Sequence, residues 1–350
     1  MLLYAHVPFC ESKCLYCAFG SVVGRDKMAK NYFDAMIVDF KSQAQKFALK
    51  KGEISTFFIG GGTPSAVNAE LYEKLFDEIS PFLAKDAEIT SEANPNSATL
   101  KWLIKMRKFG VNRISFGAQS FFEDKLKFLG RTHSARQIYK AVEMAKISGF
   151  DNINIDLIYG TKLDNKKRLT EEIENVKNLE ILHLSAYSLT LEPKTPFYKK
   201  NEYKKDSPTL AKFLINQIES IGLKQYEISN FGQVCRHNLG YWQAQNYIGI
   251  GAYAIGFLDD YRVYSPENLD EYLKDPCAKK FEHLSSDEMK LERLFLGFRS
   301  IVGVAASELS KEQIARANIL KQAKKLDFKD GRYYARNFLL ADELALFVAN

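Results

Sequence analysis

The sequence predicts an α/β protein built on parallel strands, because strand-like and helix-like segments alternate through the first two-thirds of the chain. The strand-like segments are short, carry β-branched or aromatic residues, and mostly end at Gly, Pro or Asn. Six strand–helix units in a row imply right-handed crossovers, in a doubly wound sheet or in a full or partial barrel. The six segments are Leu2–Val7, Ser55–Gly60, Glu88–Ala93, Arg113–Ala118, Asn152–Tyr159 and Leu182–Tyr187.

Helical periodicity fills the intervals between these segments. The segment from Ser134 to Ser148 has apolar residues at three- and four-residue steps, begins with a capping serine and is followed by Gly149. An earlier helix is predicted by the same spacing of Ala29, Phe33, Met36, Ile37, Phe40, Ala44 and Phe47.

The alternation ends after about residue 205. A helix over Ser207–Gly222 and a strand over Gln225–Phe231 are followed by a Gly- and aromatic-rich stretch, Asn238–Phe257, and then by a helical pattern from Ser286 onward. This change of composition predicts two domains, one over residues 1–230 and a smaller, mainly helical one over residues 231–350.

Composition and charge exclude several classes of protein. The net charge of +6 comes from 49 basic and 43 acidic residues spread along the chain, without the concentrated basic tract of a nucleic-acid binder. The longest uncharged apolar run, Tyr247 to Leu258, is too short to span a bilayer. The first residues leave no room for a targeting segment, so we expect a cytoplasmic protein without a transmembrane segment.

Three of the five cysteines, Cys10, Cys14 and Cys17, form a C-x3-C-x2-C pattern directly after the first strand. A loop of this length can wrap three thiolates around one [4Fe-4S] cluster and leave the fourth iron without a protein ligand. The alternative is a structural zinc site, which needs four ligands and could take His6 as the fourth. The spacing favours the cluster.

The run from Tyr4 to Cys17 resembles the radical-SAM superfamily, and within it the branch of oxygen-independent coproporphyrinogen III oxidase and the HemW-type haem chaperones. The resemblance implies a partial (β/α)6-type barrel in which S-adenosylmethionine (SAM) binds the open iron. One departure is that Gly160 is followed by Thr161-Lys162, where the family usually has Leu-Pro.

Several polar residues and glycines lie at or after the ends of the predicted strands, where α/β proteins place their chemistry. Glycines there let the backbone approach a ligand closely, and carboxylates suit the ribose hydroxyls and the ammonium group of SAM. Arg131 suits the SAM carboxylate, and Tyr16 would pack beside the cluster and the adenine. The resemblance implies SAM contacts for Tyr4, Tyr16, Gly61, Gly62, Thr63, Glu92, Gln119, Arg131 and Asp156.

The resemblance leaves two functions open: a haem chaperone that passes haem to acceptor proteins, respiratory ones among them, or a coproporphyrinogen III oxidase. The oxidase would have a further Cys at position 19, which is Phe19 here, and an N-terminal extension. The run His237 to Trp242 matches the H-N-x-x-Y-W pattern of the chaperone branch and offers an imidazole beside flat aromatic rings. We therefore expect a chaperone that binds haem through an exposed His237, with Cys235 as the competing ligand.

Further partners follow from this interpretation. A SAM-bound cluster implies an electron donor. A third interpretation, an enzyme that modifies RNA or peptides, lacks support because the chain has no second cysteine cluster and no basic tract.

Overall fold

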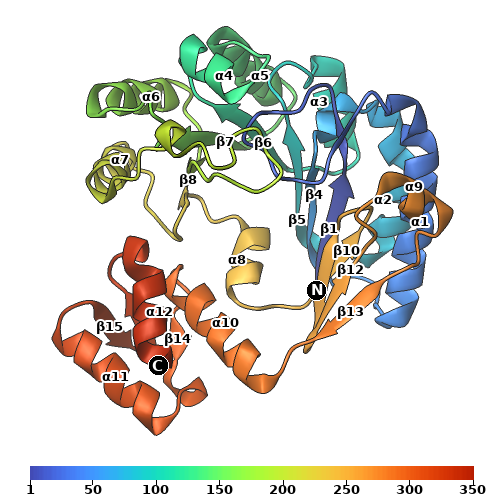
Figure 1. The fold of residues 1–350 in the computed structure, drawn as a ribbon. Helices are drawn as coiled ribbons and strands as arrows, with labels where there is room; N and C mark the ends of the chain where they lie inside the picture. Colours follow the sequence, from blue (N-terminus) through green and yellow to red (C-terminus); the bar gives the residue numbers. More distant parts are fainter.

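The computed structural model describes residues 1–350 and confirms the parallel α/β architecture (Figure 1). Six parallel strands lie side by side in chain order and form the centre of one large sheet. They are β1 (Leu2–Val7), β4 (Ile54–Gly61), β5 (Leu83–Ala93), β6 (Arg113–Gln119), β7 (Asn152–Tyr159) and β8 (His183–Ser188).

Helices cover the outer face of this sheet, whose curvature makes it a partial barrel (Figure 1). A core of 56 buried residues joins the sheet to these helices. The helices are α1 (Ala29–Lys46), α2 (Glu73–Ile79), α3 (Leu100–Lys108), α4 (Glu123–Leu129), α5 (Ala135–Ile147), α6 (Lys166–Asn178) and α7 (Pro208–Ser220).

The loop after β1 carries the three cysteines between two short paired strands, β2 (Phe9–Cys10) and β3 (Val22–Val23). Parallel strands end at the same edge of a sheet, so this loop lies near the residues that end β4 to β8. The register aligns Glu92 of β5 with Ser115 of β6, and Asp156 of β7 with Ser185 of β8.

The large sheet continues past residue 230, so the predicted boundary at that position lies too early. After α8 (Arg236–Trp242), strand β10 (Tyr247–Ile250) pairs in parallel with β1. Three antiparallel strands then extend the sheet, and α9 (Leu269–Lys274) packs against α1. These strands are β11 (Ile255–Leu258), β12 (Tyr261–Tyr264) and β13 (Lys280–His283).

The glycines that suggested a domain boundary serve this extension instead. A Cβ atom at Gly249 would lie 2.2 Å from the carbonyl oxygen of Ile255, so only glycine lets β10 and β11 approach closely. The predicted strand over Gln225–Phe231 is also mostly a turn, since the Tyr226 amide donates to the Asn230 carbonyl at 3.1 Å. Only β9 (Asn230–Gly232) pairs with β8.

A separate core of 12 buried residues, from Leu294 to Val348, defines the C-terminal unit. Its helices are α10 (Ser286–Phe298), α11 (Lys311–Gln322) and α12 (Ala341–Ala349), so it is mainly helical as expected. It also contains a small sheet of β14 (Val304–Ala305), β16 (Arg332–Ala335) and β15 (Leu326–Lys329). No helix in either part has the length and apolar character needed to cross a membrane.

Candidate functional site

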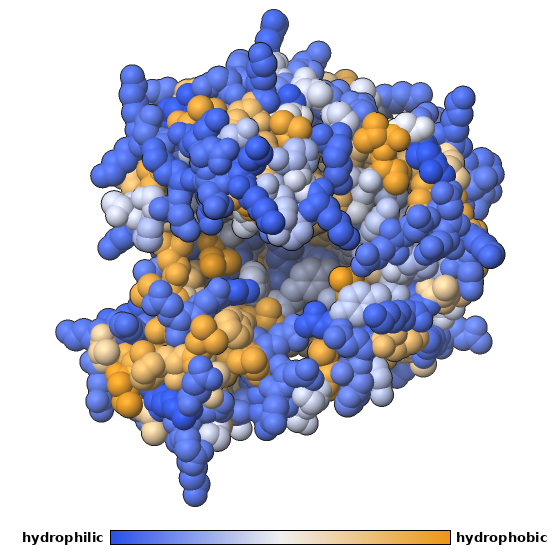
Figure 2. Space-filling model, in the orientation of Figure 1, coloured by the Kyte–Doolittle hydropathy of each residue, from blue (hydrophilic) through white to orange (hydrophobic).

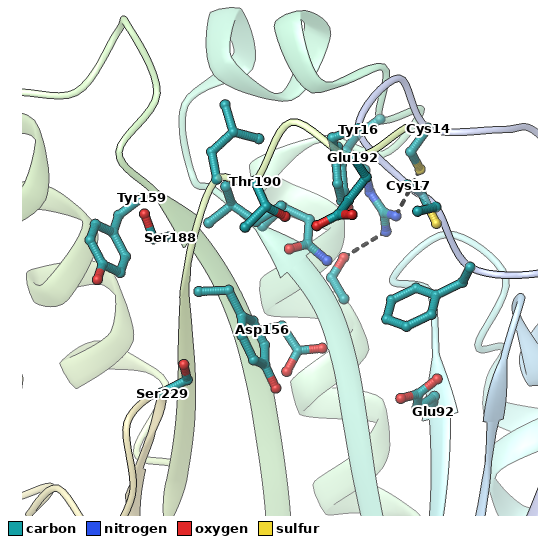
Figure 3. Close-up of a pocket in the computed structure, with 18 of the residues that line it drawn as sticks. Cys14, Tyr16, Cys17, Glu92, Asp156, Tyr159, Ser188, Thr190, Glu192 and Ser229 are labelled. Atoms are coloured by element: carbon teal, nitrogen blue, oxygen red, sulfur yellow. Dashed lines mark hydrogen bonds between the residues drawn. The ribbon is translucent and has the colours of Figure 1, made fainter. Parts of the chain in front are cut away.

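One cavity of about 770 Å³ opens at the carboxyl ends of the strands. The surface is hollowed between the barrel and the C-terminal unit (Figure 2), where Leu339 joins barrel residues in lining this cavity. Eleven of the thirteen residues proposed as ligands line it together: Cys10, Cys14, Tyr16, Cys17, Gly61, Gly62, Thr63, Glu92, Gln119, Arg131 and Asp156. Figure 3 shows Cys14 and Cys17 above Glu92 of β5, and Asp156 on β7, which β6 separates from β5.

The three cysteines are half-buried in the wall of this cavity. The sulfur of Cys10 lies 3.4 Å from Thr63 Oγ1, and Arg131 donates from Nη1 to the sulfur of Cys14 at 3.3 Å. Burial is the main cause that raises the pKa of the Cys10 and Cys17 thiols. Iron–sulfur clusters bind thiolates, so cluster binding at this site must release protons.

His6 has no free nitrogen to serve as a fourth zinc ligand. Its Nε2 lies 2.7 Å from the Gly20 carbonyl and therefore donates, which leaves Nδ1 to accept from the Tyr4 hydroxyl at 3.0 Å. Burial lowers the pKa of His6 to about 4, so the ring is neutral at pH 7. No three His, Cys, Asp or Glu side chains converge as at a single metal ion. With both nitrogens of His6 engaged, the loop offers three thiols, which is one ligand fewer than a structural zinc site needs.

Tyr4 does not line the cavity, contrary to the SAM contact that the resemblance implied for it. Its hydroxyl supports His6, which in turn fixes the carbonyl of Gly20 at the end of the cysteine loop. The ring of Tyr4 stacks on Phe58 of β4 at 6.3 Å between centroids. Tyr4 therefore positions the loop from behind.

Gly61 and Gly62 let the end of β4 pack directly against the cysteine loop. A Cβ atom at Gly61, where φ is +113°, would lie 2.7 Å from the His6 ring, and one at Gly62 would lie 2.7 Å from the Pro8 carbonyl. Thr63 closes the contact with an amide that donates to the Phe9 carbonyl at 2.8 Å. The glycines are thus required by this close approach.

Glu92 and Asp156 are two carboxyl groups that no basic side chain neutralises by a salt bridge. Burial first, and then the charge of Asp156, raise the pKa of Glu92 to about 8, against a hydrogen bond from the Gly61 amide at 3.1 Å. Burial also raises the pKa of Asp156, which accepts from Asn154 Nδ2 at 2.8 Å. Raised carboxyl pKa values are typical of functional sites, where a bound cation or the hydrogen-bond donors of a ligand can stabilise the carboxylate.

The guanidinium group of Arg131 is held in place by hydrogen bonds from its terminal nitrogens, while its Nε makes no hydrogen bond. Its Nη2 donates to Asn94 Oδ1 at 2.5 Å and to the Gly117 carbonyl at 2.6 Å. The buried Nε has no partner, which is rare in a folded protein. An anionic group in the cavity, such as an amino-acid carboxylate, would pair with the positive charge of the guanidinium group.

Gln119 is the last residue of β6, and its backbone has the left-handed conformation, with φ of +64°. The residue is 8% exposed. Such a conformation costs energy in a residue with a side chain, and it is often found at functional sites. Here it turns the chain at the end of β6, and the side chain lines the cavity.

Residues at and after the ends of β7 and β8 form an outer wall of the cavity that the sequence patterns did not predict. Asn94 was also missed, although it follows β5 closely, as the strand-end rule that found Glu92 could have indicated. The members of the outer wall that Figure 3 labels are Tyr159, Ser188, Thr190, Glu192 and Ser229.

His237 lies in α8 and is 1% exposed, so the expectation of an exposed imidazole is wrong. Its Nδ1 lies 2.7 Å from Thr56 Oγ1 near the start of β4, and its Nε2 lies 2.8 Å from the Tyr241 hydroxyl. Cys235, the competing ligand, is fully buried. Glu88 of β5 accepts from the backbone amides of Arg236 at 3.0 Å and His237 at 3.1 Å, and these bonds hold the start of α8 against the sheet.

Replacing His237 by Ala should destabilise the protein, since it removes a buried ring and leaves Thr56 and Tyr241 without a partner. We expect a loss of about 2–4 kcal/mol in the free energy of unfolding, measured by urea titration. His283→Ala is the control, because that ring is exposed and bonds only to Asp260 at the surface. Equal stability of the two variants would show that the His237 contacts contribute nothing.

A cysteine loop after the first strand of a partial barrel, facing polar strand ends across one cavity, defines a radical SAM protein. Residues 4–176 match the family model described as the radical SAM superfamily. The chain is 32% identical to the heme chaperone HemW of Bacillus subtilis (strain 168), over 88% of this chain and 86% of that protein. It is 36% identical to the heme chaperone HemW of Escherichia coli (strain K12), over 73% of this chain and 69% of that protein.

The chain therefore belongs to the HemW family of the radical SAM superfamily. The solved structure of coproporphyrinogen III oxidase (HemN) from Escherichia coli, a radical SAM enzyme, has the same fold. It aligns with a TM-score of 0.82 at 21% identity, over 100% of this chain and 90% of that one.

Proposed function

We propose that this protein is a haem chaperone that carries a [4Fe-4S] cluster with bound SAM and transfers haem to acceptor proteins. The observation that carries the proposal is the likeness to proteins named heme chaperone over 88% of the chain, at 32% identity. An electron donor for the cluster is part of the proposal.

Different residues of the cavity would bind the cluster and the different groups of SAM. Cys10, Cys14 and Cys17 would hold the cluster, whose open iron supplies a binding site and an electron for SAM. The guanidinium group of Arg131 would bind the SAM carboxylate, while Glu92 and Asp156 would accept from its ammonium or ribose groups. Tyr16, Gly61, Gly62, Thr63 and Gln119 would enclose SAM from the loop, β4 and β6.

His237 is left out of the proposed haem site. An axial bond to haem iron would require its Nε2 to leave the Tyr241 hydroxyl and the ring to lose the cover of Phe58, which stacks on it at 5.1 Å. The cavity contains no histidine, so a haem bound there would take another ligand.

The proposal is tested by assaying haem binding and coproporphyrinogen III turnover in parallel, on protein purified and reconstituted anaerobically. We expect a haem absorption spectrum that saturates at one haem per chain, transfer to an added apo-haem protein, and no protoporphyrinogen. Phe19, 70% exposed at the edge of the cavity, stands where the oxidase would have a cysteine. Conversion of coproporphyrinogen III with SAM and a reductant would instead establish the oxidase.

A further inference from the structure

We propose that three buried charges behind the cavity, Lys125, Asp164 and Glu172, form a device that positions two of the cavity's walls for SAM. The inference rests on the proposed SAM site and assigns these residues a role in its geometry. None of the three lines the cavity, so each acts through other groups.

Glu172 holds the turn that directs Gln119 into the cavity. This carboxylate of α6 is 2% exposed, and it accepts from the Ser120 hydroxyl at 2.5 Å and from the Phe121 amide at 2.8 Å. Ser120 and Phe121 directly follow Gln119, whose left-handed backbone conformation persists only where its surroundings fix it. Both oxygens of one buried carboxylate therefore stabilise the strained end of β6.

Asp164 holds the loop that follows β7 in the same manner. Its Oδ2 accepts from both the amide and the hydroxyl of Thr161, each at 2.8 Å. β7 carries Asp156 and Tyr159 into the cavity, so this loop fixes the end of a second wall.

The departure from the family's Leu-Pro at positions 161 and 162 fits this arrangement. The Lys162 amide donates to the Tyr203 carbonyl at 2.8 Å, a bond that proline could not make. The Lys162 ammonium also lies 4.4 Å from the Tyr203 ring and 5.1 Å from the Phe128 ring. Where the family has a rigid proline, this chain has a loop that is held by the hydrogen bonds of Thr161 and Lys162.

Lys125 joins the two carboxylates. Its ammonium, on a side chain 1% exposed, lies 2.7 Å from Asp164 and 3.4 Å from Glu172. A buried ion pair is weak evidence for stability by itself, because desolvation offsets the attraction. Here the carboxylates of Asp164 and Glu172 also bond to the loop after β7 and the turn after β6, and this arrangement points to positioning.

The test is Glu172→Gln, which keeps the shape of the side chain and removes its charge. Because small displacements of a ligand group weaken its contacts severely, we expect SAM affinity to fall about tenfold while iron and sulfide content stay unchanged. Affinity is measured by anaerobic calorimetry, and the effect of SAM on the electron paramagnetic resonance spectrum of the reduced cluster is recorded. Ser120→Ala removes the hydroxyl that donates to Glu172 and accepts from the Phe122 amide at 3.1 Å, and it should produce a smaller loss of the same kind.

Asp39→Asn is the matched control for destabilisation. Asp39 is a fully buried carboxylate of α1 that accepts from Lys279 at 2.8 Å and from Tyr272 at 3.0 Å, away from the cavity. It should lower the unfolding temperature while SAM affinity stays that of the parent.

The inference is overturned if Glu172→Gln and Ser120→Ala bind SAM like the parent. It is also overturned if Asp39→Asn and Glu172→Gln lower the unfolding temperature equally and lose equal SAM affinity. The loss of affinity would then follow from destabilisation in general and not from the position of Glu172. A parent protein that holds the cluster but binds no SAM would refute the proposed function first, and this inference with it.

Discussion

Replacing Cys10, Cys14 or Cys17 by Ala should abolish the iron–sulfur cluster. All three thiols line the cavity, and each would bind a different corner, so two thiolates cannot hold the cube in place. We expect less than about one-tenth of the parent's iron and sulfide per chain after anaerobic reconstitution, and no visible absorption from an iron–sulfur cluster.

Cys277→Ala is the control for this experiment, because Cys277 is exposed and lies outside the cavity. It should retain the parent's iron and sulfide. Stoichiometric zinc in the parent, or a full cluster in any of the three loop variants, would contradict the cluster assignment.

The central strands could be predicted because their signal is local. Two predicted strands, Leu2–Val7 and Asn152–Tyr159, match the bounds of β1 and β7, since Pro8 and Gly160 directly follow them. The pairing of β10 with β1 joins segments about 245 residues apart, and no local pattern encodes it. The Gly-rich segment therefore resembles a domain boundary as long as only local patterns are considered.

Some residues of the candidate site could also be predicted from local patterns, and others could not. The cysteine spacing and the strand-end positions of Glu92, Gln119 and Asp156 predicted residues that do line one cavity, because parallel strands end at one edge. The prediction that His237 is exposed is wrong, because a residue type shows what a side chain can bind and not whether it is buried. The start of α8, which carries His237, is held by Glu88, almost 150 residues earlier.

Glu92→Gln should change SAM affinity and stability in opposite directions. The Glu92 carboxylate is the group that would accept hydrogen bonds from SAM, and one charge-assisted bond is worth about 1.5–3 kcal/mol. Its loss should weaken SAM binding about ten- to a hundredfold, measured by anaerobic calorimetry on protein with its full cluster content.

The stability of the SAM-free protein should rise in the same variant, and the sign follows from the pKa. The pKa of Glu92 is about 8 in the folded chain against an ordinary value of 4.5. Between these values the folded chain keeps a proton that the unfolded chain has released. The free energy of unfolding therefore falls with rising pH, by up to about 1.4 kcal/mol per pH unit. The amide of the Glu92→Gln variant has no such proton to lose, so the variant should match the parent near pH 4.5 and exceed it at pH 8.

Glu227→Gln separates the two effects, because Glu227 is also a buried carboxyl group, with a pKa raised by burial to about 7, but it does not line the cavity. It should show a similar, smaller gain in urea stability between pH 5 and pH 8 while SAM affinity stays that of the parent. Either of two results would contradict this prediction: Glu92→Gln gains no stability at pH 8, or it binds SAM as tightly as the parent. The Glu92 carboxyl group would then not both lower the stability of the fold and contribute to SAM binding. A gain in stability together with a loss of affinity is the result expected if the charge that burial disfavours is the one that the ligand requires.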